Sequence, residues 1–271
     1  MNRGRLSVVI ITFNEENNIG NCIQSVKSLA DEIIVVDSFS QDRTCEIAEN
    51  MGAIVVQHAF EGHIQQKNWA KDQANFDWVL SLDADECLSP ELIDAILKIK
   101  LDQFSEITEN NLPIGGYSMN RLNHLGSKPI KGCGWYPDRK LRLWNRRSGQ
   151  WTGTNPHDRF ELKDSHAQKH LSGHILHYTY ENKQAVLNQA IKFGKIGSKT
   201  LDESNLITIL FKFITSPTLK FLKNYFIKGG FKYGWNGFFI CICQWLESFI
   251  KYGKGILLNL NNKKRVERSQ V

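Results

Sequence analysis

The first hundred residues alternate between short apolar runs and stretches in which apolar residues recur at helical spacing. Residues 6–12 form an apolar run rich in β-branched side chains, which predicts a buried strand, and residues 32–37, 53–57 and 77–82 are expected to form three more strands. Helical spacing predicts helices over residues 19–29, 41–51 and 62–74, and Pro90 opens a further helix over residues 90–100. This order predicts an α/β fold with a mostly parallel, Rossmann-like central sheet flanked by helices.

The pattern changes after about residue 101. Residues 115–122, 140–144 and 174–180 read as strands, with a Gly/Pro-rich loop over residues 126–137. Residues 148–156 are expected to form a second loop, and the chain is expected to be helical from about Gln184.

The C-terminal region combines aromatic residues with positive charge. Thirteen of the 29 aromatic residues lie between Phe211 and Tyr252. Residues 199–271 hold twelve Lys and Arg and four acids, so the positive net charge of the chain, +6, comes from this region. The longest wholly apolar run there, residues 238–243, is far shorter than the roughly 18 residues of a membrane span. We therefore predict an element lying in the membrane interface; the alternative is a helical cap whose aromatic side chains pack on the main domain.

The six cysteines are scattered, without a CxxC pair or spacing to histidine. This argues against a zinc site and a disulfide framework, and it favours a reducing compartment. The N-terminus enters the first strand without a signal-peptide pattern, so the cytoplasm is the expected location.

Acidic and polar residues follow three of the predicted strands. Asp83-Ala84-Asp85-Glu86 ends the fourth strand, Asp37 ends the second, and Thr12, Asn14 and Glu15 end the first. The carboxyl ends of parallel strands meet at one edge of a sheet, where ligands bind. Crowded carboxylates call for a cation, and a divalent metal carrying a phosphorylated ligand is the simplest one. A turn or capping carboxylate is the alternative for Asp37.

The ordered set of motifs resembles family 2 glycosyltransferases of the GT-A fold. The resemblance is carried by Thr-Phe-Asn-Glu-Glu at residues 12–16, Val-Val-Asp-Ser-Phe-Ser-Gln-Asp-Arg-Thr at 35–44 and Leu-Asp-Ala-Asp-Glu at 82–86. Residues 65–70, 134–138 and 141–144 are similar to the lipopolysaccharide-core β-1,4-glucosyltransferase branch.

The resemblance implies a role for each matching residue of the donor site. Thr12, Asn14 and Glu15 match positions that line the donor nucleotide. Asp37 matches the acid that accepts a hydrogen bond from the base, which suits the imide N–H of uracil, and Lys67 matches a basic residue near the pyrophosphate.

The resemblance also implies a metal, Mg²⁺ or Mn²⁺. Asp85 matches the direct metal ligand, and Asp83 matches a position near ribose and metal. Such a cation stabilises the charge that builds on a departing diphosphate. Glu86 has no counterpart role and is expected to be a solvated acid at the strand end.

His157-Asp158 is the candidate for the base that takes the proton of the acceptor hydroxyl. The branch shows His-Glu at this point, and Asp is one methylene shorter. A structural Asp158 that bridges Arg159 is the alternative, and His157 is either a neighbour of the metal or a residue that orients other groups.

Aromatic and basic residues further along are candidates for acceptor binding. Arg139 and Arg142 suit acceptor phosphates, because guanidinium matches phosphate bidentately. A small core with a solvated rim of arginines is the alternative. The candidate sugar-stacking residues are Trp135, Tyr136, Trp144 and Trp151. His177 ends the last predicted strand, where it either reaches the site or packs in the core.

Together these features predict a GT-A domain over residues 1–200, with a nucleotide-sugar-binding half (1–100) and an acceptor half (101–200), and a membrane-associated helical tail over 201–271. The resemblance implies an inverting, metal-dependent transfer of a hexose, glucose for this branch, from a UDP-sugar to a lipid-linked or lipopolysaccharide-core acceptor. The expected location is the inner face of the cell membrane, with peripheral contact through residues 205–265 and no nucleic-acid partner.

Two alternatives of other classes stay open from the sequence. A sugar-phosphate nucleotidyltransferase should carry a glycine-rich phosphate loop after the first strand, and residues 12–16 are acidic and lack glycine. A non-catalytic, membrane-bound nucleotide-sugar-binding protein would bind the donor with metal yet turn over no acceptor.

Overall fold

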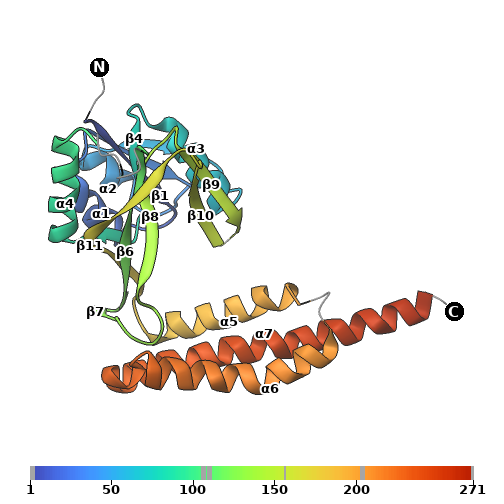
Figure 1. Cartoon of the computed structure of the whole chain (residues 1–271). Helices are drawn as coiled ribbons and strands as arrows, with labels where there is room; N and C mark the ends of the chain where they lie inside the picture. The colour runs from blue at the N-terminus through green and yellow to red at the C-terminus, as the bar shows by residue number, and fades with distance from the viewer. Residues whose placement is uncertain (1–3, 105–107, 109–111, 156, 202–204, 270–271) are drawn as a thin grey trace. The chain divides into compact units, whose positions relative to one another are not determined.

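The chain forms two compact units (Figure 1). The computed structural model describes residues 4–104, 108, 112–155, 157–201 and 205–269. Residues 1–122 and 137–178 make up what we call the sheet unit, and residues 123–136 and 179–271 make up the helical unit. The division differs from the expected boundary at residue 200, because the helix over residues 183–199 belongs with the helices that follow it.

The first four strands of the sheet unit are parallel and adjacent in the order β3-β2-β1-β4. Their register aligns the carboxyl ends: Thr12 lies opposite Asp37, and Ile11 lies opposite Asp83. The strands are β1 (Leu6–Thr12), β2 (Glu32–Asp37), β3 (Ile54–Gln57) and β4 (Trp78–Asp83). They are joined by α1 (Ile19–Val26), α2 (Thr44–Asn50) and α3 (His63–Gln73). The predicted order of the first half is therefore confirmed.

The rest of the sheet continues as β8-β6-β11-β5, and β8 pairs antiparallel with β4. The α/β GT-A fold class is confirmed, with one difference: the sheet is mixed, because only its first four strands are parallel. The added elements are β5 (Glu86–Leu88), α4 (Pro90–Leu101), β6 (Ile114–Leu125), β7 (Lys128–Pro129), β8 (Asp138–Asn145) and β11 (Ala167–Tyr180).

Alternating residues of the buried strands feed two hydrophobic clusters on the two faces of the sheet. Along β1, Val8 and Ile10 join a cluster with residues of α1, α2 and α4, whereas Val9 joins a cluster with residues of α3, β9 and β10. Gly173 lets β11 approach the start of α4: it has a φ of +90°, and a Cβ there would lie 2.4 Å from the Leu92 backbone nitrogen.

The segment expected to be a loop over residues 148–156 is largely a strand. β9 (Gly149–Thr154) pairs antiparallel with β10 (His157–Leu162) in a two-stranded sheet. Trp151 and Phe160 lie opposite each other in this hairpin and are both buried in the cluster beneath α3. The prediction of a loop was wrong because the glycines of this segment suggested a turn. The hairpin is held by the burial of Trp151 and Phe160, and two apolar residues give no strand pattern in the sequence.

The helical unit consists of long helices around a small core. α7 packs against both α5 and α6. Its elements are α5 (Lys183–Lys199), α6 (Leu206–Leu222), the π-helical turn η1 (Lys223–Ile227), the 3₁₀ turn η2 (Gly230–Tyr233) and α7 (Gly234–Ser269). Within the described residues, no helix combines the length and apolar character needed to cross a membrane.

Candidate active site

The loops after β1 and β2 hold each other in place at the carboxyl edge of the sheet. The Asn14 backbone N–H donates to Ser40 Oγ at 2.8 Å, and the Glu15 N–H donates to Thr44 Oγ1 at 2.8 Å. Asp37 is fully buried and accepts from the Ser40 N–H at 2.9 Å, which is the turn role that stood as its alternative. The Thr12 hydroxyl is buried and finds no hydrogen-bond partner among the described residues. This edge therefore combines a fixed loop pair with an unsatisfied polar atom.

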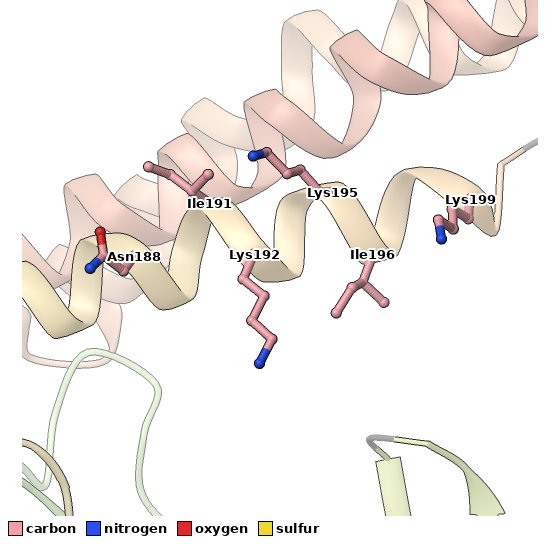
Figure 2. Close-up of a pocket in the computed structure, with 6 residues that line it drawn as sticks. All are labelled: Asn188, Ile191, Lys192, Lys195, Ile196 and Lys199. Atoms are coloured by element: carbon pink, nitrogen blue, oxygen red, sulfur yellow. The ribbon is translucent and has the colours of Figure 1, made fainter. Parts of the chain in front are cut away.

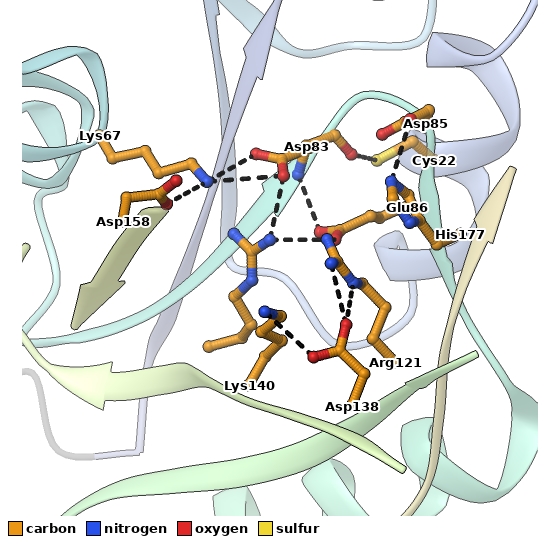
Figure 3. Close-up of polar contacts among 11 residues, drawn as sticks. Cys22, Lys67, Asp83, Asp85, Glu86, Arg121, Asp138, Lys140, Asp158 and His177 are labelled. Carbon is orange, nitrogen blue, oxygen red and sulfur yellow. Dashed lines mark hydrogen bonds and ion pairs between the residues drawn. The ribbon is translucent and has the colours of Figure 1, made fainter. Parts of the chain in front are cut away.

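Lys67 of α3 joins two carboxylates from distant parts of the chain (Figure 3). Its Nζ lies 3.1 Å from Asp83 Oδ1 and 2.8 Å from Asp158 Oδ2, and it lies 4.8 Å from the centre of the Trp151 ring. The Lys67 side chain is only 3% exposed. The structure thus brings the predicted donor-site lysine, the first acid of the Asp-Ala-Asp motif and the predicted base into direct contact.

Arg142 is a second buried cation within the acidic cluster. Its NH2 group lies 3.0 Å from Asp83 Oδ2 and 3.0 Å from Glu86 Oε1. Two expectations are corrected here. Arg142 is not presented to acceptor phosphates, because its guanidinium is buried between these two acids, and Glu86 is not a solvated acid, because its side chain is fully buried.

The charge network continues toward β6 and β8 (Figure 3). Arg121 NH1 lies 3.3 Å from Glu86 Oε1, and Arg121 NH2 lies 2.9 Å from Asp138 Oδ2. Lys140 Nζ in turn lies 3.1 Å from Asp138 Oδ1. Acids and bases therefore alternate along the network, so the protein itself compensates most of the carboxylates whose crowding suggested an external cation.

Asp85 has a different surrounding from its neighbours. Its Oδ2 lies 3.2 Å from His177 Nε2, at the point where β11 runs beside β5. The sequence favoured core packing for His177 over the site, and the structure places its imidazole at the motif (Figure 3). The sequence feature that could have indicated this position is that His177 lies near the end of a strand.

The charges of the network govern the ionisation of its acids. Burial alone would raise the pKa of Asp83, but the positive charges of Lys67 and Arg142 hold it well below its usual range. Burial likewise opposes ionisation of Asp158, and the charge and hydrogen bond of Lys67 outweigh it, so the Asp158 pKa is lowered. Both carboxylates are therefore anionic at neutral pH.

The residues predicted to bind the acceptor are divided between the two units. Trp135 and Tyr136 belong to the helical unit, where Trp135 stacks on Tyr180 with ring centres 5.0 Å apart. Arg139 belongs to the sheet unit and is exposed. The other candidate stacking residues, Trp144 and Trp151, are buried in the core, where Trp144 stacks on Phe160. For Trp144 and Trp151 the structure therefore agrees with the alternative expectation, in which they pack in a core.

The backbone of His157, the remaining residue of the predicted site, opens β10, but its side chain lies outside the described part of the structure.

A pocket in the helical unit is lined by one face of α5 and carries three lysines, Lys192, Lys195 and Lys199 (Figure 2). None of the predicted site residues lines that pocket.

Comparison with known proteins supports one family. The family model "Glycosyl transferase family 2" matches residues 7–105. An uncharacterised glycosyltransferase of Rickettsia typhi is 30% identical over 96% of this chain and 89% of its own length. The lipopolysaccharide core biosynthesis glycosyltransferase LpsC of Rhizobium meliloti is 26% identical over 92% of this chain and 91% of its own.

Among solved structures, glucosyl-3-phosphoglycerate synthase of Mycobacterium tuberculosis, in complex with Mn²⁺, UDP and glucosyl-3-phosphoglycerate, matches with 25% identity and a TM-score of 0.35. That match covers 44% of each chain. The relationship therefore rests on the sequence matches, which extend over nearly the whole length of the Rickettsia relative. On this ground the chain belongs to the family 2 glycosyltransferases.

Proposed function

We propose that this glycosyltransferase moves a hexose, glucose in our assignment, from a UDP-sugar to a lipid-linked or lipopolysaccharide-core acceptor, with inversion at the anomeric carbon. The single observation that carries the proposal is the position of Lys67. It bridges Asp83 of the Asp-Ala-Asp motif and Asp158 of the β9–β10 hairpin. One cation thereby links the side of the site where the donor diphosphate would lie to the side where the acceptor would be deprotonated.

The loops after β1 and β2 supply the nucleotide site in this proposal. Asp37 has two oxygens with about four acceptor positions, so its contacts with Ser40 leave capacity for the imide N–H of uracil. The buried, unpartnered hydroxyl of Thr12 supports a ligand at this edge, because such groups are ordinarily satisfied. Asn14 and Glu15 are held by Ser40 and Thr44 and would border the same nucleotide.

A divalent metal fits one part of the acidic cluster. Among the described residues no group of three or more His, Cys, Asp or Glu is placed to hold a metal ion. Asp85 and His177 offer a carboxylate and an imidazole 3.2 Å apart, and Mg²⁺ or Mn²⁺ commonly takes few protein ligands and completes its shell with phosphate oxygens and water. When bound there, the ion would neutralise charge on the departing UDP. Asp83 is engaged by Lys67 and Arg142, so we assign it to positioning them.

Asp158 is the base in this scheme. A carboxylate paired with Lys67 at 2.8 Å has a lowered pKa and is a weak base, because proton transfer favours a pKa near the working pH. A donor diphosphate competes with Asp158 for Lys67, since both are anionic. Donor binding would then free the carboxylate to accept the proton of the acceptor hydroxyl, so the base becomes active when the donor is in place.

A lipid-linked acceptor would require the protein to work at a membrane. We propose that the protein works at the inner face of the cell membrane and contacts it peripherally through residues 205–265, because a lipid-linked acceptor cannot leave the bilayer. Arg139, exposed on β8, is retained as a candidate for acceptor phosphates, with Trp135 and Tyr136 as candidates for sugar contacts. The support for membrane contact is the high exposure of apolar side chains on α6.

The test is a donor screen. Release of the nucleoside diphosphate is measured with UDP-, GDP- and dTDP-hexoses, with Mg²⁺, Mn²⁺ or a chelator, in the presence of a lipopolysaccharide-core extract. We expect UDP release from UDP-glucose that depends on both metal and extract. Turnover of GDP-sugars alone would overturn the assignment of Asp37 to uracil, and donor binding without turnover of any sugar would support a purely binding protein.

A further inference from the structure

The helical unit exposes far more large apolar side chains than the sheet unit. Of the 21 large hydrophobic residues that are exposed among the described residues, 15 lie between residues 207 and 260. A soluble surface normally shows such residues singly. Their concentration in one unit calls for something that covers them.

One part of this surface is a stripe along α6. Leu210, Phe211 and Ile214 lie three, four and seven residues after Ile207, and Leu222 lies eight after Ile214, so they share one side of the helix; Ile207 and Ile214 are 76% and 73% exposed. Of the two buried positions of α6, Ile209 lies on a different side of the helix, and Pro217 lies at the edge of the stripe, seven residues after Leu210. The exposed stripe therefore borders the side of α6 that packs in its own core.

The second part is the turn between α6 and α7, which we call the tip. Phe226, Ile227, Phe231 and Trp235 are between 50% and 79% exposed and lie on η1, η2 and the first residues of α7. Phe226 is one turn beyond Leu222, so the tip continues the stripe. Exposed aromatic rings at a helix junction are typical of segments that settle at the boundary between headgroups and acyl chains.

The charges around the surface favour an anionic partner. Lys223, Lys228 and Lys232 are exposed at the tip, between its apolar side chains. Residues 205–260 contain seven lysines and a single acid, Glu247, and that acid lies 3.3 Å from Lys220. Long lysine side chains can lie along apolar surface while the ammonium group reaches phosphate headgroups. A protein partner or a second copy of this chain would not by itself need this excess of positive charge.

We propose that the α6 stripe and the tip insert into the interfacial layer of an anionic lipid bilayer. α6 would lie in the plane of the membrane, with the lysines of the tip at the level of the lipid phosphates. The inference extends the proposed peripheral contact to particular side chains. It rests on that proposed contact and not on the proposed reaction, since binding to lipid needs no turnover.

The experiment is flotation of the full chain with vesicles of phosphatidylcholine alone or with added phosphatidylglycerol. The wild type should float with the anionic vesicles, less with the neutral ones, and less at high salt. Ile214→Glu in the stripe and Ile227→Glu in the tip should each lower the partition coefficient about tenfold or more, because each places a charge where an apolar side chain inserts. The matched control is Leu101→Glu, which alters a side chain of the sheet unit that is 82% exposed.

Three results would overturn the proposal. One is no flotation of the wild type with either vesicle. Another is an equal loss in Leu101→Glu. The third is a wild-type dimer in light scattering that Ile214→Glu converts to monomer, because a second copy would then cover the stripe. UDP release in solution is measured on the same variants; unchanged release together with lost flotation separates failure of membrane contact from failure of the proposed activity.

Discussion

At the scale of residues, two buried cations decide what the carboxylates after β4 do. Arg142 and Lys67 both contact Asp83, and Arg142 also contacts Glu86. The acids were evident in the sequence because they are consecutive. Lys67 was expected near the donor from the family resemblance alone, and the contacts of Lys67 and Arg142 with Asp83 were not expected, because these cations lie 16 and 59 residues from Asp83 in the sequence and the fold brings them together.

The correction at Arg142 leads to a prediction about stability. Arg142→Ala removes one of the two cations beside the fully buried Glu86 and is expected to lower the free energy of unfolding by about 1–3 kcal/mol, because Glu86 then keeps only Arg121, at 3.3 Å. Arg139→Ala, at an exposed neighbour on the same strand, should leave stability nearly unchanged. Urea denaturation of both variants checks this. Normal stability of Arg142→Ala with only a raised acceptor KM would instead support a role in acceptor binding.

A second prediction concerns pH. Lys67 holds the pKa of Asp158 below its usual range, so the ionised base persists as pH falls, and the acid limb of kcat/KM should lie below the ordinary Asp value of about 3.9. Lys67→Gln removes the main charge that opposes the effect of burial, so the limb should move to higher pH. The measurement is kcat/KM for UDP-glucose against pH.

Asp158→Asn provides the control for that profile. It should reduce turnover by about 10²–10⁴-fold while donor binding is kept, as expected for loss of a general base. If Lys67→Gln leaves the acid limb in place, or Asp158→Asn keeps near-normal turnover, Asp158 is a structural partner of Lys67 and another group takes the proton.

At the scale of elements, the parallel strands were predictable and the β9–β10 hairpin was not. β1, β2 and β4 are largely apolar and mostly buried, β3 is a short apolar run at the edge of the sheet, and the ends of all four fall within a residue of the expected positions. β9 is short and contains two glycines, so its sequence carries no strand pattern. The hairpin is instead stabilised by tertiary contacts, because Trp151 and Phe160 pack in the hydrophobic cluster that includes residues of α3. The hairpin matters because it carries Asp158.

Gly149 tests how closely the hairpin is packed. A Cβ at this position would lie 2.1 Å from the Glu161 carbonyl oxygen, so Gly149→Ala should force the two strands apart and cost about 1–3 kcal/mol of stability. Gly20→Ala in α1 is the matched control: its Cβ would meet nothing closer than 3.6 Å, and alanine favours a helix, so stability should stay or rise. Thermal unfolding of the two variants gives the comparison, and equal melting temperatures would contradict the packing described here.

At the scale of the whole molecule, the proposed catalytic residues and the surface rich in apolar side chains and lysines belong to different units. Lys67, Asp83, Asp85, Asp158 and His177 all belong to the sheet unit. The sequence indicated such a division from the composition of residues 199–271. It could not place the boundary, because α5 has an ordinary helical pattern and its partner α7 follows more than thirty residues later.

In the proposed mechanism, the Asp-Ala-Asp motif forms a metal-dependent UDP-sugar site in which Asp85 and His177 hold the ion. Isothermal titration calorimetry of UDP-glucose, with Mn²⁺ or with a chelator, tests it most directly. We predict that Mn²⁺ strengthens binding at least tenfold in the wild type and in Asp72→Asn, an exposed acid on α3, and that Asp85→Asn loses this gain. Equal affinity with and without Mn²⁺, or an undiminished gain in Asp85→Asn, would contradict the account.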